Sequence, residues 1–109
     1  MRVLVVDDHT DSRELVLEWA RILGHEVVGA GSVAEALAET TRSTFDAIVT
    51  DLHLPDGDGA DFIRRVRAAD RPPRVVIALT GLPPAEPAPF DVVLAKPVDL
   101  ERLRKLLSA

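Results

Sequence analysis

Cysteine is absent from this sequence of 109 residues, which excludes thiol catalysis, iron–sulfur clusters and zinc sites made of cysteine. No apolar run approaches the roughly 20 residues of a membrane-spanning helix, and the apolar segment at residues 3–6 is too short for a signal peptide. We therefore expect a cytoplasmic protein that does not bind membranes. Acidic and basic residues are interspersed at a formal net charge of −5, which argues against a nucleic-acid partner. The length fits a single domain, residues 1–109.

Five short apolar runs rich in β-branched residues indicate strands, at residues 3–6, 27–30, 47–49, 75–79 and 92–95. The runs are nearly continuous rather than alternating, which is typical of parallel strands that are covered on both faces. Helical patterns fill most of the intervals between them. The sequence therefore predicts an α/β fold, a doubly wound five-stranded parallel sheet with the strand order 2-1-3-4-5.

Four helices are expected from capping residues and apolar spacing. The first spans about residues 10–23, and its predicted buried face consists of Leu15, Val16, Trp19, Ile22 and Leu23. The second begins with a capping box of Ser32 and Glu35. The third spans about residues 59–69, with three arginines expected to face water, Arg64, Arg65 and Arg67. The last begins near Asp99, a residue type favoured at helix N-caps.

Proline interrupts this repeat of strands and helices, because six of the eight prolines lie between Pro72 and Pro89. A proline inside a helix costs roughly 3 kcal/mol, so the prolines after residue 79 exclude an ordinary helix before the fifth strand. About ten residues of extended polyproline chain span roughly 30 Å, enough to connect two parallel strands. We therefore expect a proline-rich strap. It either leaves apolar sheet surface open to a partner, or Leu82 and Phe90 fold back and cover that surface.

Polar residues follow four of the five apolar runs. Ligands of an open parallel sheet bind at the carboxyl ends of its strands, where these residues would meet. They are Asp7 and Asp8 after the first run, Thr50 and Asp51 after the third, Thr80 after the fourth and Lys96 after the fifth. The second strand, at the edge of the predicted sheet, is followed only by a helix cap. His9 and His25 are interpreted as surface histidines.

The three aspartates suggest a metal site. Carboxylates at one edge repel one another unless a cation lies among them, and oxygen ligands suit a hard ion such as Mg²⁺. With Mg²⁺ and Lys96 balancing charge and Thr80 offering a hydroxyl, one carboxylate can accept a phosphoryl group. Asp51 is the predicted acceptor. Taken singly, each of these residues is more often part of a turn or a cap, so the prediction depends on their combination.

Four motifs resemble the receiver domain of bacterial two-component response regulators, a family with a flavodoxin-like fold. They are Val5-Val6-Asp7-Asp8, the segment from Asp51 to Gly59, Thr80-Gly81 and Lys96-Pro97. The resemblance extends over essentially the whole chain. The sequence Lys-Pro-Val-Asp-Leu at residues 96–100 is similar to receivers that are attached to hybrid histidine kinases.

The resemblance implies a phosphorelay function. A phosphohistidine, on a histidine kinase or a histidine phosphotransfer domain, would donate its phosphoryl group to Asp51 in the presence of Mg²⁺. Asp8, Asp51 and the backbone carbonyl of His53 would contact the metal ion, and Asp7 would support it largely through water. The family catalyses its own phosphorylation and slow dephosphorylation only, so we do not expect an enzyme with a separate substrate.

The same resemblance implies roles for further residues. Lys96 would pair with the phosphoryl oxygens and Thr80 would bond to another of them. The side chains of His53 and Leu82 would set the lifetime of the phosphoryl group by controlling access of water. The Lys96-Pro97 peptide bond is commonly cis in this family.

Two departures from the family pattern concern its output surface. The family usually has an aromatic residue three positions before the lysine, whereas this sequence has Val93. Phe90 has the opposite strand parity to Val93, so we do not expect it to replace the aromatic, and the proline-rich strap takes the place of the family's fourth helix. We therefore expect an atypical output surface. A homodimer or another partner would use the face of the last two strands and the last helix.

Two alternative functions follow from the same residues. One is a protein interaction module that keeps the fold and the acidic residues but binds its partner independently of phosphorylation. The other, a metal-dependent phosphatase with an aspartyl nucleophile, is disfavoured. Such an enzyme needs a second acid/base aspartate close behind the nucleophile, whereas Asp56 and Asp58 lie in a glycine-rich turn.

Overall fold

The computed structural model describes residues 1–81 and 89–108 of the chain. The elements in chain order are β1 (Arg2–Val6), α1 (Thr10–Ile22), β2 (Glu26–Ala30), α2 (Val33–Arg42), β3 (Ala47–Asp51), β4 (His53–Leu54), β5 (Gly57–Asp58), α3 (Gly59–Arg67), β6 (Val75–Thr80), β7 (Val92–Ala95) and α4 (Leu100–Ser108). The five longer strands form one sheet with the order β2-β1-β3-β6-β7, and all of its pairs are parallel. This is the predicted order, because the two-residue strands β4 and β5 form a separate antiparallel pair.

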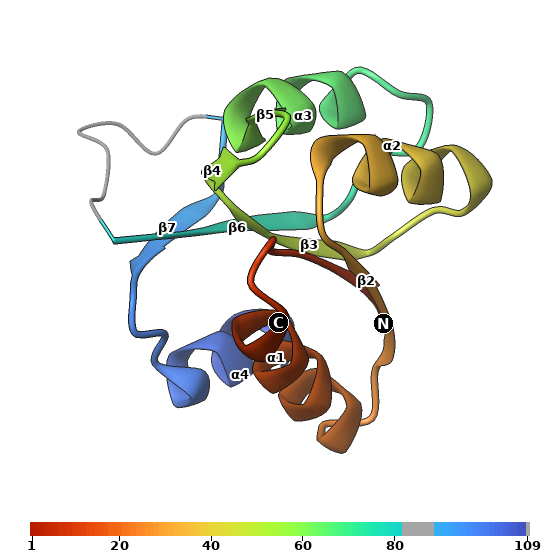
Figure 1. The fold of residues 1–109 in the computed structure, drawn as a ribbon. Coiled ribbons are helices and arrows are strands. Elements are labelled where there is room, and N and C mark those ends of the chain that lie inside the picture. Colours follow the sequence, from red (N-terminus) through yellow and green to blue (C-terminus); the bar gives the residue numbers. More distant parts are fainter. Residues whose placement is uncertain (82–88, 109) are drawn as a thin grey trace.

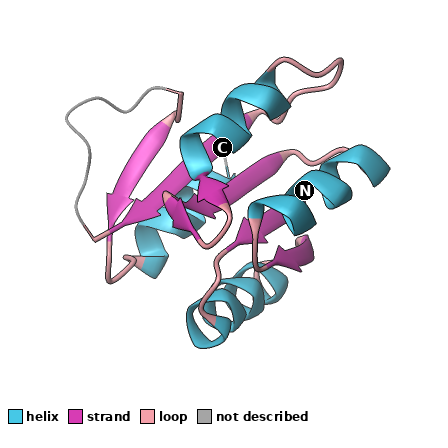
Figure 2. Cartoon of the chain, turned by 45° about the horizontal axis from the view of Figure 1, so that its top comes forward, coloured by secondary structure: helices cyan, strands magenta, loops and turns pink. Residues whose placement is uncertain are grey.

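The helices cover both faces of the sheet, as the continuous apolar strands predict. In Figure 1, α1 and α4 lie on one side of the sheet and α2 and α3 on the other. Figure 2 shows the same arrangement, with the β4–β5 pair beside the start of α3. Within residues 1–81 and 89–108, none of these helices has the length and apolar character needed to cross a membrane.

The strand residues divide between two cores according to their parity, because successive side chains point to opposite faces of a sheet. Val3 and Val5 pack with α1 and α4, whereas Leu4 and Val6 pack with α2 and α3. All four are buried. The residues needed for function therefore have a closely packed support on both sides.

The buried face of α1 differs from the predicted one. Val16, Leu17 and Ala20 are buried, whereas Leu15 and Ile22 are 52% and 66% exposed. At 100° per residue, Leu15 and Ile22 lie on the flank of the helix that turns away from Ala20. The neighbouring elements β1, β2 and α4 contact only a narrow stripe of α1, so the predicted face was wrong at these two positions.

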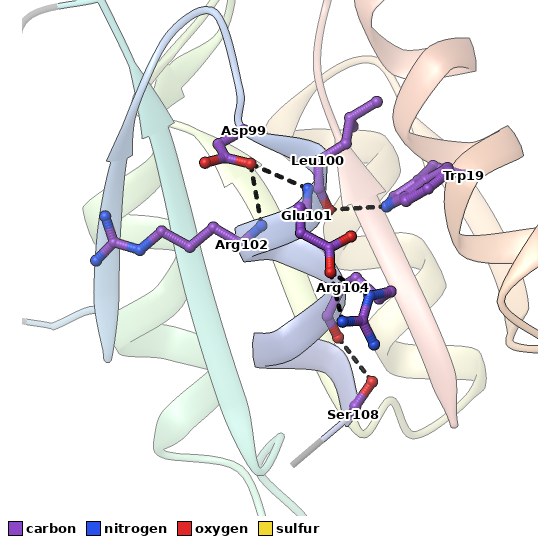
Figure 3. A network of polar contacts seen from close by, with 7 residues as sticks. All are labelled: Trp19, Asp99, Leu100, Glu101, Arg102, Arg104 and Ser108. Carbon is purple, nitrogen blue, oxygen red and sulfur yellow. Dashed lines mark hydrogen bonds and ion pairs between the residues drawn. The ribbon is translucent and has the colours of Figure 1, made fainter.

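The half-buried Trp19 joins α1 to α4, where its Nε1–H donates to the carbonyl of Leu100 at 2.9 Å (Figure 3). The same figure shows the predicted cap of α4. There Oδ1 of Asp99 accepts hydrogen bonds from two backbone amides of the first turn, at 3.0 and 3.1 Å. On α4 itself, Arg104 pairs with Glu101. The bond from Trp19 fixes the last helix against the first, and the other contacts stabilise α4 itself.

The cap of α2 is confirmed in part. Ser32 Oγ accepts a hydrogen bond from the amide of Glu35 at 3.1 Å. The carboxylate of Glu35, however, accepts from the amide of Gly31 rather than from that of the cap residue itself. The cap of α3 is Asp58, whose Oδ1 accepts from the amide of Ala60 at 2.7 Å.

The segment just before β7 contributes Phe90 to the core. The described residues include no helix between β6 and β7, and most of the predicted proline-rich strap, with Leu82, lies outside them. Phe90 is 6% exposed and belongs to the core on the α2 and α3 side, against which Val93 also packs. The parity argument that separated Phe90 from Val93 was wrong, because β7 begins only at Val92 and Phe90 is not part of the strand.

Arg67 does not face water as predicted. Its Nε–H donates to the carbonyl of Pro89 at 2.8 Å, and its Nη2 donates to Oδ2 of Asp91 at 2.9 Å. The same oxygen of Asp91 accepts from the amide of Val76 at 2.7 Å. Arg67 and Asp91 thus join the end of α3, the start of β6 and the chain just before β7, while Arg64 and Arg65 are exposed as expected.

Candidate functional site

The predicted site residues meet at the carboxyl ends of the strands. Asp7 directly follows β1, Asp51 ends β3, Thr80 ends β6 and Lys96 directly follows β7. The sheet register aligns these ends, because Asp51 is opposite Leu79 and Thr80 is opposite Ala95. Four segments that are far apart in sequence therefore present their polar ends along one edge of the sheet. We call the site formed by Asp7, Asp8, His9, Asp51 and Lys96 the acid pocket.

Four potential metal ligands lie close together in the acid pocket. One ligand atom each from Asp7, Asp8, His9 and Asp51 lies within 4.8 Å of the others. Asp7 and Asp51 are buried, whereas Asp8 and His9 are exposed. The three aspartates were predicted and His9 was not. The only signal for His9 in the sequence was its position directly after the acidic pair.

Asp51 forms the buried centre of the acid pocket. Its Oδ1 lies 2.8 Å from Nζ of Lys96. The two groups are not aligned for a hydrogen bond, and Oδ1 is buried without a hydrogen-bond partner among the described residues. A buried carboxylate oxygen without a hydrogen bond is rare in proteins. Together with the nearby carboxylates, this oxygen fits a site for a divalent cation, which prefers oxygen ligands.

The charged groups of the acid pocket shift one another's pKa values. Burial raises the pKa of Asp51 to about 6, the nearby carboxylate of Asp7 adds to the rise, and Lys96 opposes it. Burial by itself would lower the pKa of Lys96, but the carboxylates of Asp51, Asp7 and Asp8 raise it above its ordinary value. At neutral pH the pocket therefore contains an ionised Asp51 beside a charged Lys96.

The position of Asp7 is fixed by three hydrogen bonds. Its amide donates to the carbonyl of Ala30 at 3.0 Å, and its Oδ1 accepts from the amide of His9 at 2.9 Å. Its carbonyl accepts from Nη1 of Arg13 at 2.8 Å. Arg13 was not predicted as part of the site, because nothing in a helical arginine indicates a contact with the preceding strand end.

Gly59 makes room for the carbonyl of Asp51. A Cβ atom at this position would lie 2.3 Å from that carbonyl oxygen, closer than two atoms can approach. The amide of Gly59 also donates to the carbonyl of Leu52 at 2.8 Å. Glycine is therefore required for α3 to begin directly against the end of β3.

The turn between β4 and β5 is attached to α2. The carboxylate of Asp56 accepts hydrogen bonds from the amides of Val33 at 2.8 Å and Ala34 at 3.0 Å, and these bonds hold the pKa of Asp56 below its usual range. His53 lies in β4, is exposed and is paired with Asp58 of β5. Since Asp56 caps α2 and Asp58 caps α3, both act as helix caps, which agrees with the argument against a phosphatase.

The last two strands bring Thr80 and Lys96 together through the backbone. The amide of Lys96 donates to the carbonyl of Thr80 at 2.9 Å, and Thr80 is buried. The Lys96-Pro97 peptide bond is cis, as the resemblance implied. Val93 lies in β7 opposite Ala78, at the position where the family usually has an aromatic residue.

Comparison with known proteins establishes the family. The model of the response regulator receiver domain matches residues 3–108. The chain belongs to this family. It is 34% identical to the virulence sensor protein BvgS of Bordetella bronchiseptica over 99% of this chain and 10% of BvgS. It is also 34% identical to the response regulator protein PilR of Pseudomonas aeruginosa, over 98% of this chain and 25% of PilR.

Solved structures agree with this assignment. The chemotaxis response regulator CheY4 of Vibrio cholerae superimposes with a TM-score of 0.86 at 29% identity, over 98% of this chain and 95% of CheY4. This receiver domain thus has the flavodoxin-like fold of a chemotaxis regulator, and it spans only a small part of BvgS and PilR. Receiver domains are signalling modules of two-component systems that bind Mg²⁺ at an acidic pocket, and the aspartate cluster here could hold such an ion.

Proposed function

We propose that this receiver domain accepts a phosphoryl group on Asp51 from a phosphohistidine of a histidine kinase or a histidine phosphotransfer domain. One observation supports the proposal above all. The buried Oδ1 of Asp51 has no hydrogen bond among the described residues, and it lies 2.8 Å from Nζ of Lys96 within a group of carboxylates. A buried nucleophile beside a fixed cation is the arrangement that phosphoryl transfer requires.

Phosphoryl transfer to Asp51 depends mainly on the positions of the reacting groups and on the charges around them. A carboxylate oxygen of Asp51 forms a bond to phosphorus, the bond between phosphorus and the histidine nitrogen breaks, and the imidazole takes up a proton. The ammonium of Lys96 stabilises the negative charge on the phosphoryl oxygens, and Thr80 donates a hydrogen bond to one of them. Because the pKa of Asp51 is about 6, the nucleophile is ionised at neutral pH.

A metal ion completes the charge balance in this proposal. Asp8, Asp51 and the carbonyl of His53 would hold Mg²⁺, with Asp7 supporting it largely through water. The ion supplies positive charge to phosphoryl oxygens that the carboxylates would otherwise repel. The phosphorylated state would last for a time set by the side chains of His53 and Leu82, of which Leu82 lies outside the described residues.

The output of this receiver domain is proposed to be atypical. Val93 stands where the family usually has an aromatic, and Phe90, Arg67 and Asp91 hold the chain before β7 in place. Phosphorylation would therefore change the surroundings of β7 only slightly. Amide exchange measured with and without phosphorylation tests this, and large changes in protection over residues 92–95 would contradict it.

We further propose that residues 1–109 form one receiver domain that works in the cytoplasm and acts on no separate substrate. The face of β6, β7 and α4 would be the contact surface for a second copy or another partner. Sedimentation of the purified domain tests self-association through this face.

The experiment that tests phosphorylation uses the intact mass of the protein. The wild-type domain incubated with Mg²⁺ and a small phosphoryl donor should gain the mass of one phosphoryl group, and Asp51→Asn should gain none. The matched control is Asp61→Asn, which removes an exposed carboxylate that pairs with Arg64 on α3. An adduct that persists in Asp51→Asn, or no adduct on the wild type, excludes Asp51 as the acceptor.

One alternative is an interaction module that binds its partner regardless of phosphorylation. The observation that favours it is the fixed chain before β7, where Asp91 bonds both Arg67 and the amide of Val76. If this alternative holds, wild type and Asp51→Asn would bind the partner equally well, with or without the phosphoryl donor. A partner whose affinity depends on the phosphoryl group would exclude it.

A further inference from the structure

His9 contributes a nitrogen atom to a group of potential metal ligands whose other members are carboxylate oxygens. Its Nδ1 lies 3.3 Å from Oδ1 of Asp8 and 3.6 Å from Oδ1 of Asp7. The backbone of His9 is fixed beside Asp7, because the amide of His9 donates to Oδ1 of Asp7 at 2.9 Å. The side chain of His9 is 72% exposed, so no packing requirement explains why it lies there.

The distances fit neighbouring ligands of one metal ion. Two ligands at right angles, each about 2.1 Å from an octahedral ion, lie about 3.0 Å apart. The observed separations of 3.3 and 3.6 Å are slightly longer than this. A small rotation of an exposed imidazole closes such a difference.

A buried acceptor is a second observation that fits a cation in the pocket. Asp51 is nine-tenths buried, and its Oδ1 lacks a hydrogen bond among the described residues. It lies in the same 4.8 Å group as Asp7, Asp8 and His9. Lys96 supplies one positive charge beside three carboxylates. A divalent cation would therefore offset the negative charge that Lys96 leaves unbalanced. Because Asp8 and His9 are exposed, an ion can enter from solvent on their side.

Nitrogen and oxygen ligands select different ions. Carboxylate, carbonyl and water suit Mg²⁺, whereas imidazole suits the first-row transition ions, whose affinities rise from Mn²⁺ to Cu²⁺. We propose that Nδ1 of His9 is a ligand of the divalent ion in the acid pocket and gives this receiver domain a preference for imidazole-binding transition ions over Mg²⁺. The inference rests on the proposed metal site, and it assigns to His9 a role in choosing the ion.

Titration calorimetry at constant pH tests the inference directly, with Ni²⁺ as the imidazole-binding probe and MgCl₂ as the reference. Replacing the ligand in His9→Ala should weaken Ni²⁺ binding at least about tenfold and leave Mg²⁺ binding within about twofold. The matched control is His25→Ala, because His25 lies beyond the far end of α1 and bonds the N-terminus. That variant should bind both ions as the wild type does.

Two results would overturn the role of His9. Equal Ni²⁺ affinity in wild type and His9→Ala would show that the imidazole is not a ligand. Tighter Mg²⁺ binding in His9→Ala with unchanged Ni²⁺ binding would show that His9 acts only as a counter-charge to Asp7 and Asp8. Circular dichroism of each variant establishes that it folds, which the exposure of His9 leads us to expect.

The outcomes also separate this inference from the proposed function. If the wild type binds Mg²⁺ and gains a phosphoryl group on Asp51 while His9→Ala binds Ni²⁺ normally, only the role of His9 is excluded. If the wild type binds neither Mg²⁺ nor Ni²⁺, the metal site fails and His9 with it. If Ni²⁺ binding depends on His9 but no phosphoryl adduct forms, the metal site stands and the phosphoacceptor role fails.

Discussion

The acid pocket and the chain around β7 are two parts of one sheet that relate very differently to the family pattern. The aspartates and the lysine that the resemblance implied lie together in the pocket, at the ends of β1 and β3 and just after β7, and Thr80 ends the neighbouring strand β6. We call the second region the clamped edge, and it consists of Arg67, Pro89, Phe90, Asp91 and Val93. It has valine at position 93, where the family usually has an aromatic residue, and it is held by the bonds of Arg67 and the burial of Phe90. The comparison teaches that the strand ends can keep the family pattern while the segment before the last strand departs from it.

The two regions also differ in what they contribute to the free energy of unfolding. The acid pocket contains a buried carboxylate whose pKa is raised mainly by burial, so its ionised form destabilises the fold. The clamped edge buries an aromatic side chain and satisfies the backbone of β6, which stabilises the fold. We therefore expect substitutions in the two regions to change the free energy of unfolding in opposite directions.

The largest effect is expected at the clamped edge, for Phe90→Ala. Removing a buried aromatic side chain leaves a cavity against the α2 and α3 core, which typically costs about 3–5 kcal/mol. Urea unfolding followed by circular dichroism measures the loss. Ile22→Ala removes an exposed apolar side chain and should change stability by less than about 0.5 kcal/mol. A similar small change for Phe90→Ala would show that Phe90 does not stabilise this core.

In the acid pocket, Asp51→Asn should stabilise the protein. The pKa of Asp51 is about 6 in the fold and about 4 in an unfolded chain, a difference on the order of 3 kcal/mol. Since the folded state binds the proton more tightly, the ionised carboxylate weakens the fold fully above pH 6 and not at all below pH 4. Urea unfolding in a chelator should show the gain at pH 7.5 and none near pH 4. A gain that did not depend on pH would contradict this origin.

A smaller effect is expected for Asp91→Ala at the clamped edge. The substitution leaves the buried amide of Val76 without its acceptor and releases Arg67, which should cost about 1–3 kcal/mol. The control Asp61→Ala removes a carboxylate from an exposed pair within α3 and should cost less than about 1 kcal/mol. If both variants lose the same stability in urea, Asp91 does not connect α3 with the sheet.

Much of this fold was predictable because it is set by local patterns. The apolar runs located all five long strands, and Ser32 and Asp99 located two helix starts. Asp7, Asp51 and Lys96 could be assigned to one site because strand ends meet in a parallel sheet whatever the details of packing. These predictions depended on position along an element rather than on the conformation of particular side chains.

The predictions that failed depended on contacts between distant segments. The exposure of Leu15 reflects how narrowly the neighbouring elements contact α1, which spacing alone does not reveal. The bond from Arg67 to Pro89 depends on the path of the chain before β7. His9 joined the pocket because of the turn after β1, where its amide bonds Asp7, and a sequence does not specify the direction of such a side chain.

The central claim is that Asp51 is the residue that receives the phosphoryl group. The most direct measurement is to phosphorylate the wild-type domain with a small donor and Mg²⁺, trap the acyl phosphate by reduction with borohydride, and locate the modified residue by peptide mass spectrometry. The account predicts one modified position, residue 51, and none in Asp51→Asn. Modification at Asp7 or Asp8 instead, or no modification of a folded domain, would contradict it.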